Sequence, residues 1–195
     1  MLAKGSEYWI LGSFALTAFI AFFTPYVYVG ILIILFTLLF FRDPERSSKS
    51  YDSTDVVSPA DGRVLKIQDK KLSIFMNIHN VHVNRSPVDG EVVDVQYHKG
   101  SRFPAFYKDS DRNERNIVTI RTRIGNVIVT QISGAVVRRI VCYVKQNESV
   151  ARGQRIGMIR FGSRVDVVLP RNYSFVVSTG QNVKAGETTI AKLLK

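Results

Sequence analysis

Hydrophobic positions follow two different patterns along this chain. From Trp9 to Phe41 there is no charged residue, whereas from Asp55 onward short apolar runs alternate with turn residues. A long uncharged apolar stretch is typical of membrane-associated helix, and short β-branched runs between turns are typical of antiparallel strands. The pattern therefore predicts an N-terminal helical segment followed by an all-β domain of the sandwich or barrel type.

A break divides the apolar stretch near its middle. One straight helix over the whole run would be about 50 Å long at 1.5 Å per residue, although a bilayer core needs only about 20 residues. Pro25 removes a backbone donor and disfavours helix at the residue before it. We therefore expect two short helices, over 9–23 and 27–41.

Basic residues flank this predicted hairpin on both sides, with Lys4 before it and Arg42 and Arg46 after it. Because basic flanks favour the cytoplasmic side of a membrane, both ends of the hairpin are expected there. Each leg is short, so the hairpin either spans the bilayer or enters it as a shallow re-entrant element.

The polar, Pro-containing stretch 42–53 is expected to link two domains, a membrane-associated hairpin with its linker (1–47) and a β-rich catalytic domain (48–195). Strands are expected at 64–67, 72–76, 91–95, 117–120, 126–132 and 165–169. Two pairs of segments repeat: 58–64 resembles 86–92, and 150–156 resembles 183–190. The second pair is similar to the glycine turns of lipoyl-type β-domains, since Gly153 and Gly186 can adopt the positive φ of a hairpin turn.

Net charge is strongly positive, +11 at pH 7 with an isoelectric point near 10.0. Beside an apolar hairpin, such charge favours an anionic lipid surface as partner. No nucleic-acid-binding motif is visible, so no nucleic-acid partner is expected. The chain has three histidines and one cysteine without a paired-ligand pattern, and a catalytic zinc needs three protein ligands. No metal site is predicted.

Eight segments in one order carry a resemblance to a known family. They are 40–46, 58–64, 75–87, 111–116, 131–134, 138–140, 153–159 and Arg160 to Pro170 (RFGSRVDVVLP). Together they resemble the short-form phosphatidylserine decarboxylases, including the archaetidylserine decarboxylases. The resemblance runs from the apolar hairpin to Gly186.

The resemblance implies that the chain cuts itself between Gly162 and Ser163. Ser163 would attack the Gly162 carbonyl, and elimination and hydrolysis would leave a pyruvoyl group as covalent cofactor. The fragments 1–162 and 163–195 would stay together as a heterodimer, or as a higher oligomer of it. A pyruvoyl carbonyl supplies the electron sink that decarboxylation of an amino acid needs, through an imine with the substrate amine.

The same resemblance nominates the groups that activate Ser163. Asp61 would be the carboxylate and His82 the base, since an imidazole with a pKa near 6.5 can accept the proton. His79 is a weaker candidate. The register of the family motif places Arg85 where a second histidine is expected, and arginine stays protonated. The identity of the base therefore stays open at this point.

The implied activity is conversion of phosphatidylserine to phosphatidylethanolamine at the cell membrane, with the catalytic domain on the cytoplasmic face. The same chemistry on archaetidylserine is an alternative. A non-catalytic membrane-anchored β-domain adaptor would explain the hairpin and the strands, but not the ordered segments. A soluble pyruvoyl decarboxylase of free amino acids would leave the apolar run from Trp9 to Phe41 unexplained.

Overall fold

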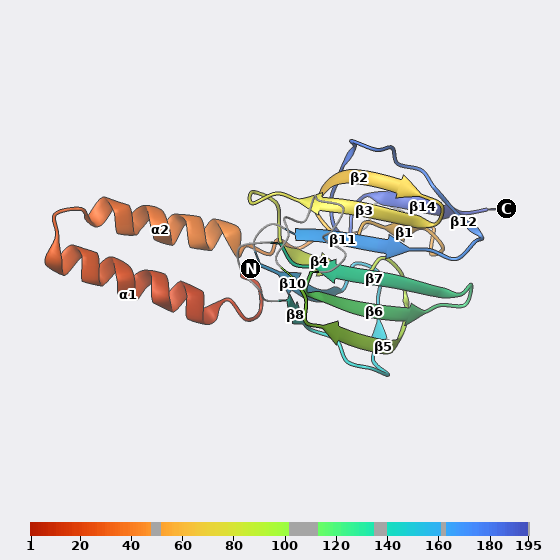
Figure 1. Cartoon of the computed structure of the whole chain (residues 1–195), viewed down its shortest axis with the longest axis horizontal. Helices are drawn as coiled ribbons and strands as arrows, with labels where there is room; N and C mark the ends of the chain where they lie inside the picture. The colour runs from red at the N-terminus through yellow and green to blue at the C-terminus, as the bar shows by residue number, and fades with distance from the viewer. Residues whose placement is uncertain (48–51, 102–112, 135–139, 161–162, 195) are drawn as a thin grey trace. The chain divides into compact units, whose positions relative to one another are not determined.

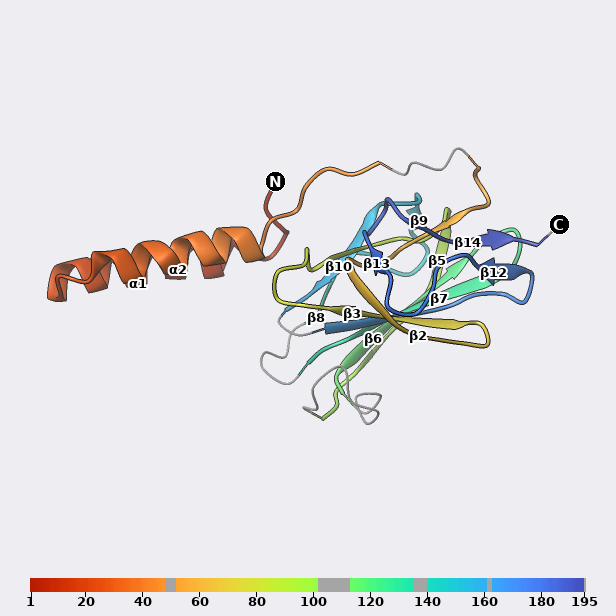
Figure 2. The same ribbon diagram turned by 90° about the horizontal axis from the view of Figure 1, so that it is seen from above.

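The computed structural model of the chain describes residues 1–47, 52–101, 113–134, 140–160 and 163–194. These residues divide into two compact units, Met1–Glu45 and Arg46–Lys195. The first unit contains two helices and the second contains the strands (Figures 1 and 2).

The first unit is a helical hairpin made of α1 (Glu7–Phe23) and α2 (Val27–Phe40). These bounds confirm the predicted helices to within two residues at each end. The helices lie side by side (Figure 1), and the Thr17 hydroxyl of α1 donates a hydrogen bond to the Gly30 carbonyl of α2, with an O···O distance of 2.9 Å. A Cβ atom at Gly30 would lie 2.6 Å from Thr17 Cγ2. Glycine therefore permits the close approach of the two helices.

The surface of this hairpin is apolar. Phe22 is 83% exposed and Leu32 is 62% exposed, and large apolar side chains project from both helices. The hydroxyls of Ser13, Thr17 and Thr37 each donate to a carbonyl oxygen within their own helix. Within the described part of the chain, no helix is both long and apolar enough to cross a membrane.

The second unit is built from antiparallel strands, which confirms the predicted β-rich fold. The strands are β1 (Val56–Val57), β2 (Gly62–Gln68), β3 (Lys71–Met76), β4 (Val83–Arg85), β5 (Gly90–His98), β6 (Arg115–Arg121), β7 (Asn126–Ile132), β8 (Ile140–Cys142), β9 (Ser149–Val150), β10 (Arg155–Ile159), β11 (Ser163–Val168), β12 (Tyr173–Phe175), β13 (Asn182–Val183) and β14 (Thr189–Leu193). An eight-stranded sheet has the order β13-β2-β3-β11-β7-β6-β5-β9. Two three-stranded sheets have the orders β1-β14-β12 and β4-β10-β8.

The core lies against one face of the eight-stranded sheet, which we call the inner face. Side chains alternate between faces along a strand, and β3 buries Leu72, Ile74 and Met76 on this face. Val165 and Val167 of β11 lie opposite Ile74 and Leu72 in the register and belong to the same buried cluster. The inner face of β11 is therefore the face that carries residues 163, 165 and 167.

Residues 163–194 are woven into two of the sheets. Strand β11 lies between β3 and β7 in the centre of the large sheet, β13 pairs with β2, and β14 lies between β1 and β12. A cut before Ser163 would break one peptide bond and leave these pairings intact.

The two sequence repeats form matching interactions. The Ser58 hydroxyl donates to the Ala60 carbonyl, and the Ser86 hydroxyl donates to the Val88 carbonyl, each at 2.7 Å. Gly186 N–H donates to the Ser58 carbonyl and Gly153 N–H donates to the Ser86 carbonyl, each at 2.8 Å.

The φ angles of the two turn glycines are positive, +73° at Gly186 and +82° at Gly153. This is the left-handed conformation that glycine adopts most readily. The predicted glycine turns are therefore confirmed.

Candidate active site

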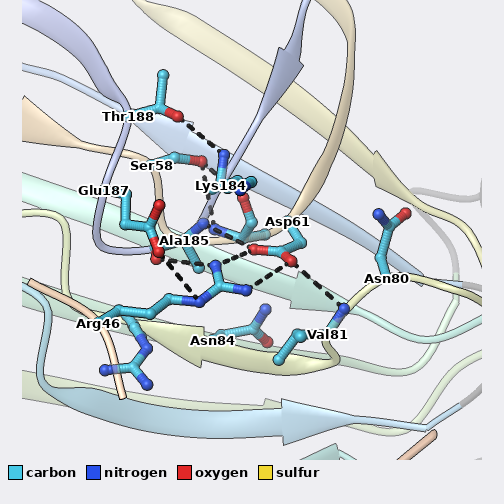
Figure 3. Close-up of polar contacts among 12 residues, drawn as sticks. Arg46, Ser58, Asp61, Asn80, Val81, Asn84, Lys184, Ala185, Glu187 and Thr188 are labelled. Atoms are coloured by element: carbon cyan, nitrogen blue, oxygen red, sulfur yellow. Dashed lines mark hydrogen bonds and ion pairs between the residues drawn. The ribbon is translucent and has the colours of Figure 1, made fainter. Parts of the chain in front are cut away.

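The Asp61 carboxylate connects three parts of the chain. Asp61 lies immediately before β2 and is 7% exposed. Its Oδ1 accepts from Arg46 Nη1 and from Ala185 N–H (2.8 Å), and its Oδ2 accepts from Arg46 Nη2 (2.9 Å) and Val81 N–H (3.4 Å) (Figure 3). A two-point pairing of arginine with carboxylate fixes both position and orientation. Asp61 thus joins the start of the β unit to the segment before β4 and to the turn at residues 184–187.

Arg46 itself is held by more than this carboxylate. Its side chain is only 7% exposed, its Nη1 donates to the Ala185 carbonyl at 3.1 Å, and its Nε lies 3.6 Å from a carboxylate oxygen of Glu187. Figure 3 shows the guanidinium group between Asp61 and Glu187. Arg46 was expected as a basic flank of the apolar run and as part of the segment 40–46 that resembles the family, but its burial against a carboxylate was not predicted.

His82 is completely buried and lies just before β4. Its Nδ1 is 2.9 Å from the Asn80 carbonyl oxygen. Because a carbonyl only accepts hydrogen bonds, this contact places the proton of the neutral ring on Nδ1 and the lone pair on Nε2. Since Asp61 accepts from Val81 N–H, it positions the backbone directly beside this histidine.

Ser163 is the first residue of β11 and is also completely buried. It lies opposite Met76 of β3, so its side chain is on the inner face of the sheet. Its hydroxyl makes no hydrogen bond to any residue that the structure describes. The other residue of the predicted cleavage site, Gly162, lies outside the described residues.

Pairing between strands brings the His82 segment to the Ser163 end of the sheet. Ile159 N–H donates to the His82 carbonyl at 3.2 Å, which extends the β10–β4 pairing by one residue. His82 and Asn84 then share one face of this extended segment. The Asn84 amide Nδ2 is 3.6 Å from the sulfur of Met76, the residue opposite Ser163. The segment that carries His82 is thus linked, through Asn84, to the residue opposite Ser163.

The two secondary candidates lie differently. His79 is exposed in the turn between β3 and β4. Arg85 is buried, but it is one residue from Asn84 and so lies on the opposite face of β4. Its Nη1 donates to the Gly153 carbonyl at 2.9 Å. Of the three candidate bases, His79 is exposed and Arg85 supports a glycine turn, whereas His82 is completely buried.

Over the residues that the structure covers, no group of three or more His, Cys, Asp or Glu side chains could hold a metal ion. The chemistry of the site is that of an alcohol, an imidazole and a carboxylate. Serine nucleophiles are activated by groups of these types, but here the His82 Nδ1 contact is to the Asn80 carbonyl, and the Asp61 carboxylate binds Arg46 and Val81 N–H.

A chain of buried amides was also missed by the sequence analysis. Asn116, Gln131 and Asn84 are 2%, 0% and 0% exposed, and their side chains are joined by hydrogen bonds. A signal was present in the sequence, because Asn116 and Gln131 occupy positions of β6 and β7 that alternate in phase with the buried residues Val118 and Val129.

In the comparison with known proteins, the matching family model and the names of the similar proteins agree. The family model for phosphatidylserine decarboxylase matches residues 33–191. A protein of Methanosarcina acetivorans, provisionally named an archaetidylserine decarboxylase proenzyme, is 47% identical over 99% of this chain and 97% of its own length. Proteins named phosphatidylserine decarboxylase proenzyme are also similar. That of Syntrophus aciditrophicus is 43% identical over 91% of both chains, and that of Aromatoleum aromaticum is 48% identical over 83% of this chain and 80% of its own.

The repeat supplies a matched control for Asp61. Asp89 occupies the equivalent place in the other repeat, where its Oδ1 accepts from Arg152 N–H at 2.8 Å, but it is exposed. We predict that Asp61→Asn lowers the free energy of unfolding by about 3 kcal/mol or more, because it removes the carboxylate that pairs at two points with the buried Arg46. Asp89→Asn should cost less than about 1 kcal/mol.

Both substitutions are compared by urea unfolding in a Ser163→Ala background, which lacks the hydroxyl at the expected cleavage site. Equal losses of stability in the two variants would contradict a special role for the Arg46–Asp61 pair.

Proposed function

The chain belongs to the phosphatidylserine decarboxylase family, and on that premise we propose that Ser163 cuts the chain at its own N-terminal side and becomes the pyruvoyl group of a serine phospholipid decarboxylase. One observation supports this most strongly. The Ser163 hydroxyl is buried on the inner face of the sheet without a hydrogen bond to any described residue. A buried hydroxyl without a partner is costly, which favours a reactive role over a structural one.

The chain's own groups account for the first step. His82 Nε2 accepts the Ser163 hydroxyl proton, and the oxygen attacks the Gly162 carbonyl carbon. The peptide C–N bond breaks, the proton passes to the released amine, and an ester between residues 162 and 163 results. The Asn80 carbonyl keeps the histidine in the required tautomer, and Asp61 fixes the adjacent backbone through Val81 N–H.

The ester is resolved by elimination. Loss of the Cα proton of residue 163 expels the Gly162 carboxylate and cuts the chain. The product is an enamine, which takes up a proton at its terminal carbon and becomes an imine. Addition of water to this imine releases ammonia and leaves a keto group at residue 163. The pyruvoyl carbonyl then supplies an acceptor for the substrate amine and for the electron pair left when carbon dioxide departs.

The site suits such a group because residue 163 is buried within a sheet and its neighbours exclude bulk water. Met76 lies directly opposite it and is completely buried. Water exclusion protects a carbanion from uncontrolled protonation and strengthens hydrogen bonds to developing charge. The pairings of β11, β13 and β14 hold fragment 163–195 against fragment 1–162 after cleavage.

The substrate is a serine phospholipid, whose carboxylate is lost to give the ethanolamine phospholipid. Relatives named for archaetidylserine and relatives named for phosphatidylserine are about equally similar to this chain, at 47% and 43–48% identity. We therefore propose that the enzyme recognises the serine headgroup that the two lipids share.

The membrane is the proposed location of this enzyme. The α1–α2 hairpin has an apolar surface, and its Ser13, Thr17 and Thr37 hydroxyls are satisfied within the helices, which is what a lipid environment requires. With basic residues on both flanks, the hairpin enters the bilayer from the cytoplasmic side and both of its ends stay there. The active unit then works on lipids in the cytoplasmic leaflet.

We predict that Ser163→Ala abolishes both cleavage and release of carbon dioxide from a serine phospholipid, since it removes the nucleophile and the precursor of the cofactor. Ser101→Ala, at another Gly-Ser pair with an exposed serine, is the control and should behave as wild type. Gel electrophoresis and carboxyl-labelled lipid measure the two effects. A Ser163→Ala protein that still cuts itself would refute the assignment.

Headgroup recognition predicts similar activity on lipids with different tails. Phosphatidylserine and archaetidylserine in the same detergent should give kcat/KM values within about tenfold of each other, a difference of about 1.4 kcal/mol in transition-state binding. Free serine should be a poor substrate. A preference of more than about 1000-fold for one tail chemistry would show that the tails are recognised as well.

Membrane attachment predicts that the double substitution Phe22→Asp with Phe23→Asp prevents flotation of the protein with vesicles of anionic lipid. The reason is that a charge placed within the hydrocarbon costs about 3 kcal/mol per residue. Val176→Asp, at an exposed apolar residue of the β unit, is the control and should float normally. Flotation of the double variant at the wild-type level would contradict attachment through the hairpin.

A further inference from the structure

The inner face of the large sheet becomes more polar toward Ser163. In the register, one row across the sheet contains Leu72, Val167, Val129 and Val118, all buried and apolar. The next row toward Ser163 contains Ile74, Val165, Gln131 and Asn116, in which two positions are amides. Polar side chains therefore enter a buried surface where the proposed reaction occurs.

These amides form a directed chain that ends at Asn84. Asn116 Nδ2 donates to Gln131 Oε1 at 2.9 Å, and Gln131 Nε2 donates to Asn84 Oδ1 at 2.7 Å. Gln131 Oε1 and Asn84 Oδ1 both accept a hydrogen bond, which fixes the orientation of each amide. Asn84 Nδ2 is therefore the donor that remains at the end of this series. Buried amide networks of this kind restrict side chains to one orientation.

A glycine provides the space that these three amide side chains occupy. A Cβ atom at Gly157 of β10 would lie 2.7 Å from Gln131 Nε2 and 2.7 Å from the Val141 carbonyl oxygen. Gly157 pairs with Asn84 across β10 and β4, so the strand paired with that of Asn84 leaves room for the amide that orients Asn84. The arrangement depends on all three elements, β4, β7 and β10.

The Asn84 amide, the last of the three hydrogen-bonded amides, donates to a weak acceptor. Asn84 Nδ2 is directed at the Met76 sulfur at 3.6 Å, and a thioether is a weak hydrogen-bond acceptor. Met76 is the residue opposite Ser163, whose hydroxyl has no hydrogen bond among the described residues. A buried donor with a weak acceptor thus contacts the residue opposite a buried hydroxyl that has no partner among the described residues.

We propose that Asn84 is a further catalytic residue, whose amide donates a hydrogen bond to the Ser163 oxygen as it becomes negative during self-cleavage. The Ser163 proton passes to His82, while Asn84 keeps both of its protons and supplies only the hydrogen bond. Gln131 is a positioning residue that acts through Asn84. The inference rests on the proposed self-cleavage at Ser163.

The test follows cleavage of the full-length chain after cell-free synthesis. Asn84→Ala should slow cleavage about 100-fold or more, the usual cost of removing a donor to a developing oxyanion. Met76→Leu keeps the packing but removes the sulfur, and should cleave within about threefold of wild type. Gln131→Met leaves Asn84 in place but unoriented, and should be about tenfold slower.

Two further readouts separate chemistry from folding. Melting temperatures are measured for each variant in a Ser163→Ala background, and Asn84→Ala should remain folded at the assay temperature. Hydroxylamine cleaves esters, so it should release no fragment from slowly cleaving Asn84→Ala, because that variant is blocked before the ester forms. If Asn84→Ala does not fold, Gln131→Met is tested in the same way.

Cleavage of folded Asn84→Ala within threefold of wild type would overturn the proposal. So would equal slowing by Met76→Leu, which would show that packing matters and the donor does not, or release of a fragment from Asn84→Ala by hydroxylamine. For Gln131→Met, an unchanged rate in a folded chain would also count against it. A wild-type chain that is never cut at Ser163 would instead refute the proposed function itself.

Discussion

The buried ion pair between Arg46 and Asp61 is the interaction on which the site depends. The carboxylate accepts hydrogen bonds from the arginine, from Val81 N–H beside His82, and from Ala185 N–H in the C-terminal segment. Removing two charges from water is costly, and the cost is offset only when every hydrogen-bonding position is used. Asp61 meets this condition, and its carboxylate therefore holds the segment before β4, which contains His82, together with the C-terminal segment.

A comparison of the two equivalent aspartates of the internal repeat shows which of their interactions form the turn and which occur only at the site. Asp89 and Asp61 each accept the backbone N–H of the residue before a turn glycine. Asp89 is exposed, whereas Asp61 is buried and additionally binds Arg46 and Val81. The same turn therefore occurs twice, and only in the repeat of Asp61 is the aspartate buried and paired with an arginine.

Much of the fold could be predicted because local patterns determine it. The apolar run broken at Pro25 predicted the two helices, and the alternation along 72–76 and 126–132 predicted β3 and β7. Arg46 could not be predicted, since its partner Asp61 is distant in the sequence and the surrounding residues are those of an ordinary linker. Gln131 lay in the buried phase of the predicted strand 126–132, and Asn116 directly before the predicted strand 117–120. Only the pairing of β6 with β7 shows that they contact each other.

The central claim, that Ser163 becomes a pyruvoyl group, is tested most directly by the intact mass of the small fragment from purified protein. The account predicts a chain of residues 163–195 that is lighter by one ammonia than the same chain beginning with serine. A small fragment that begins with an unchanged Ser163, or an active protein consisting of a single uncut chain, would contradict it.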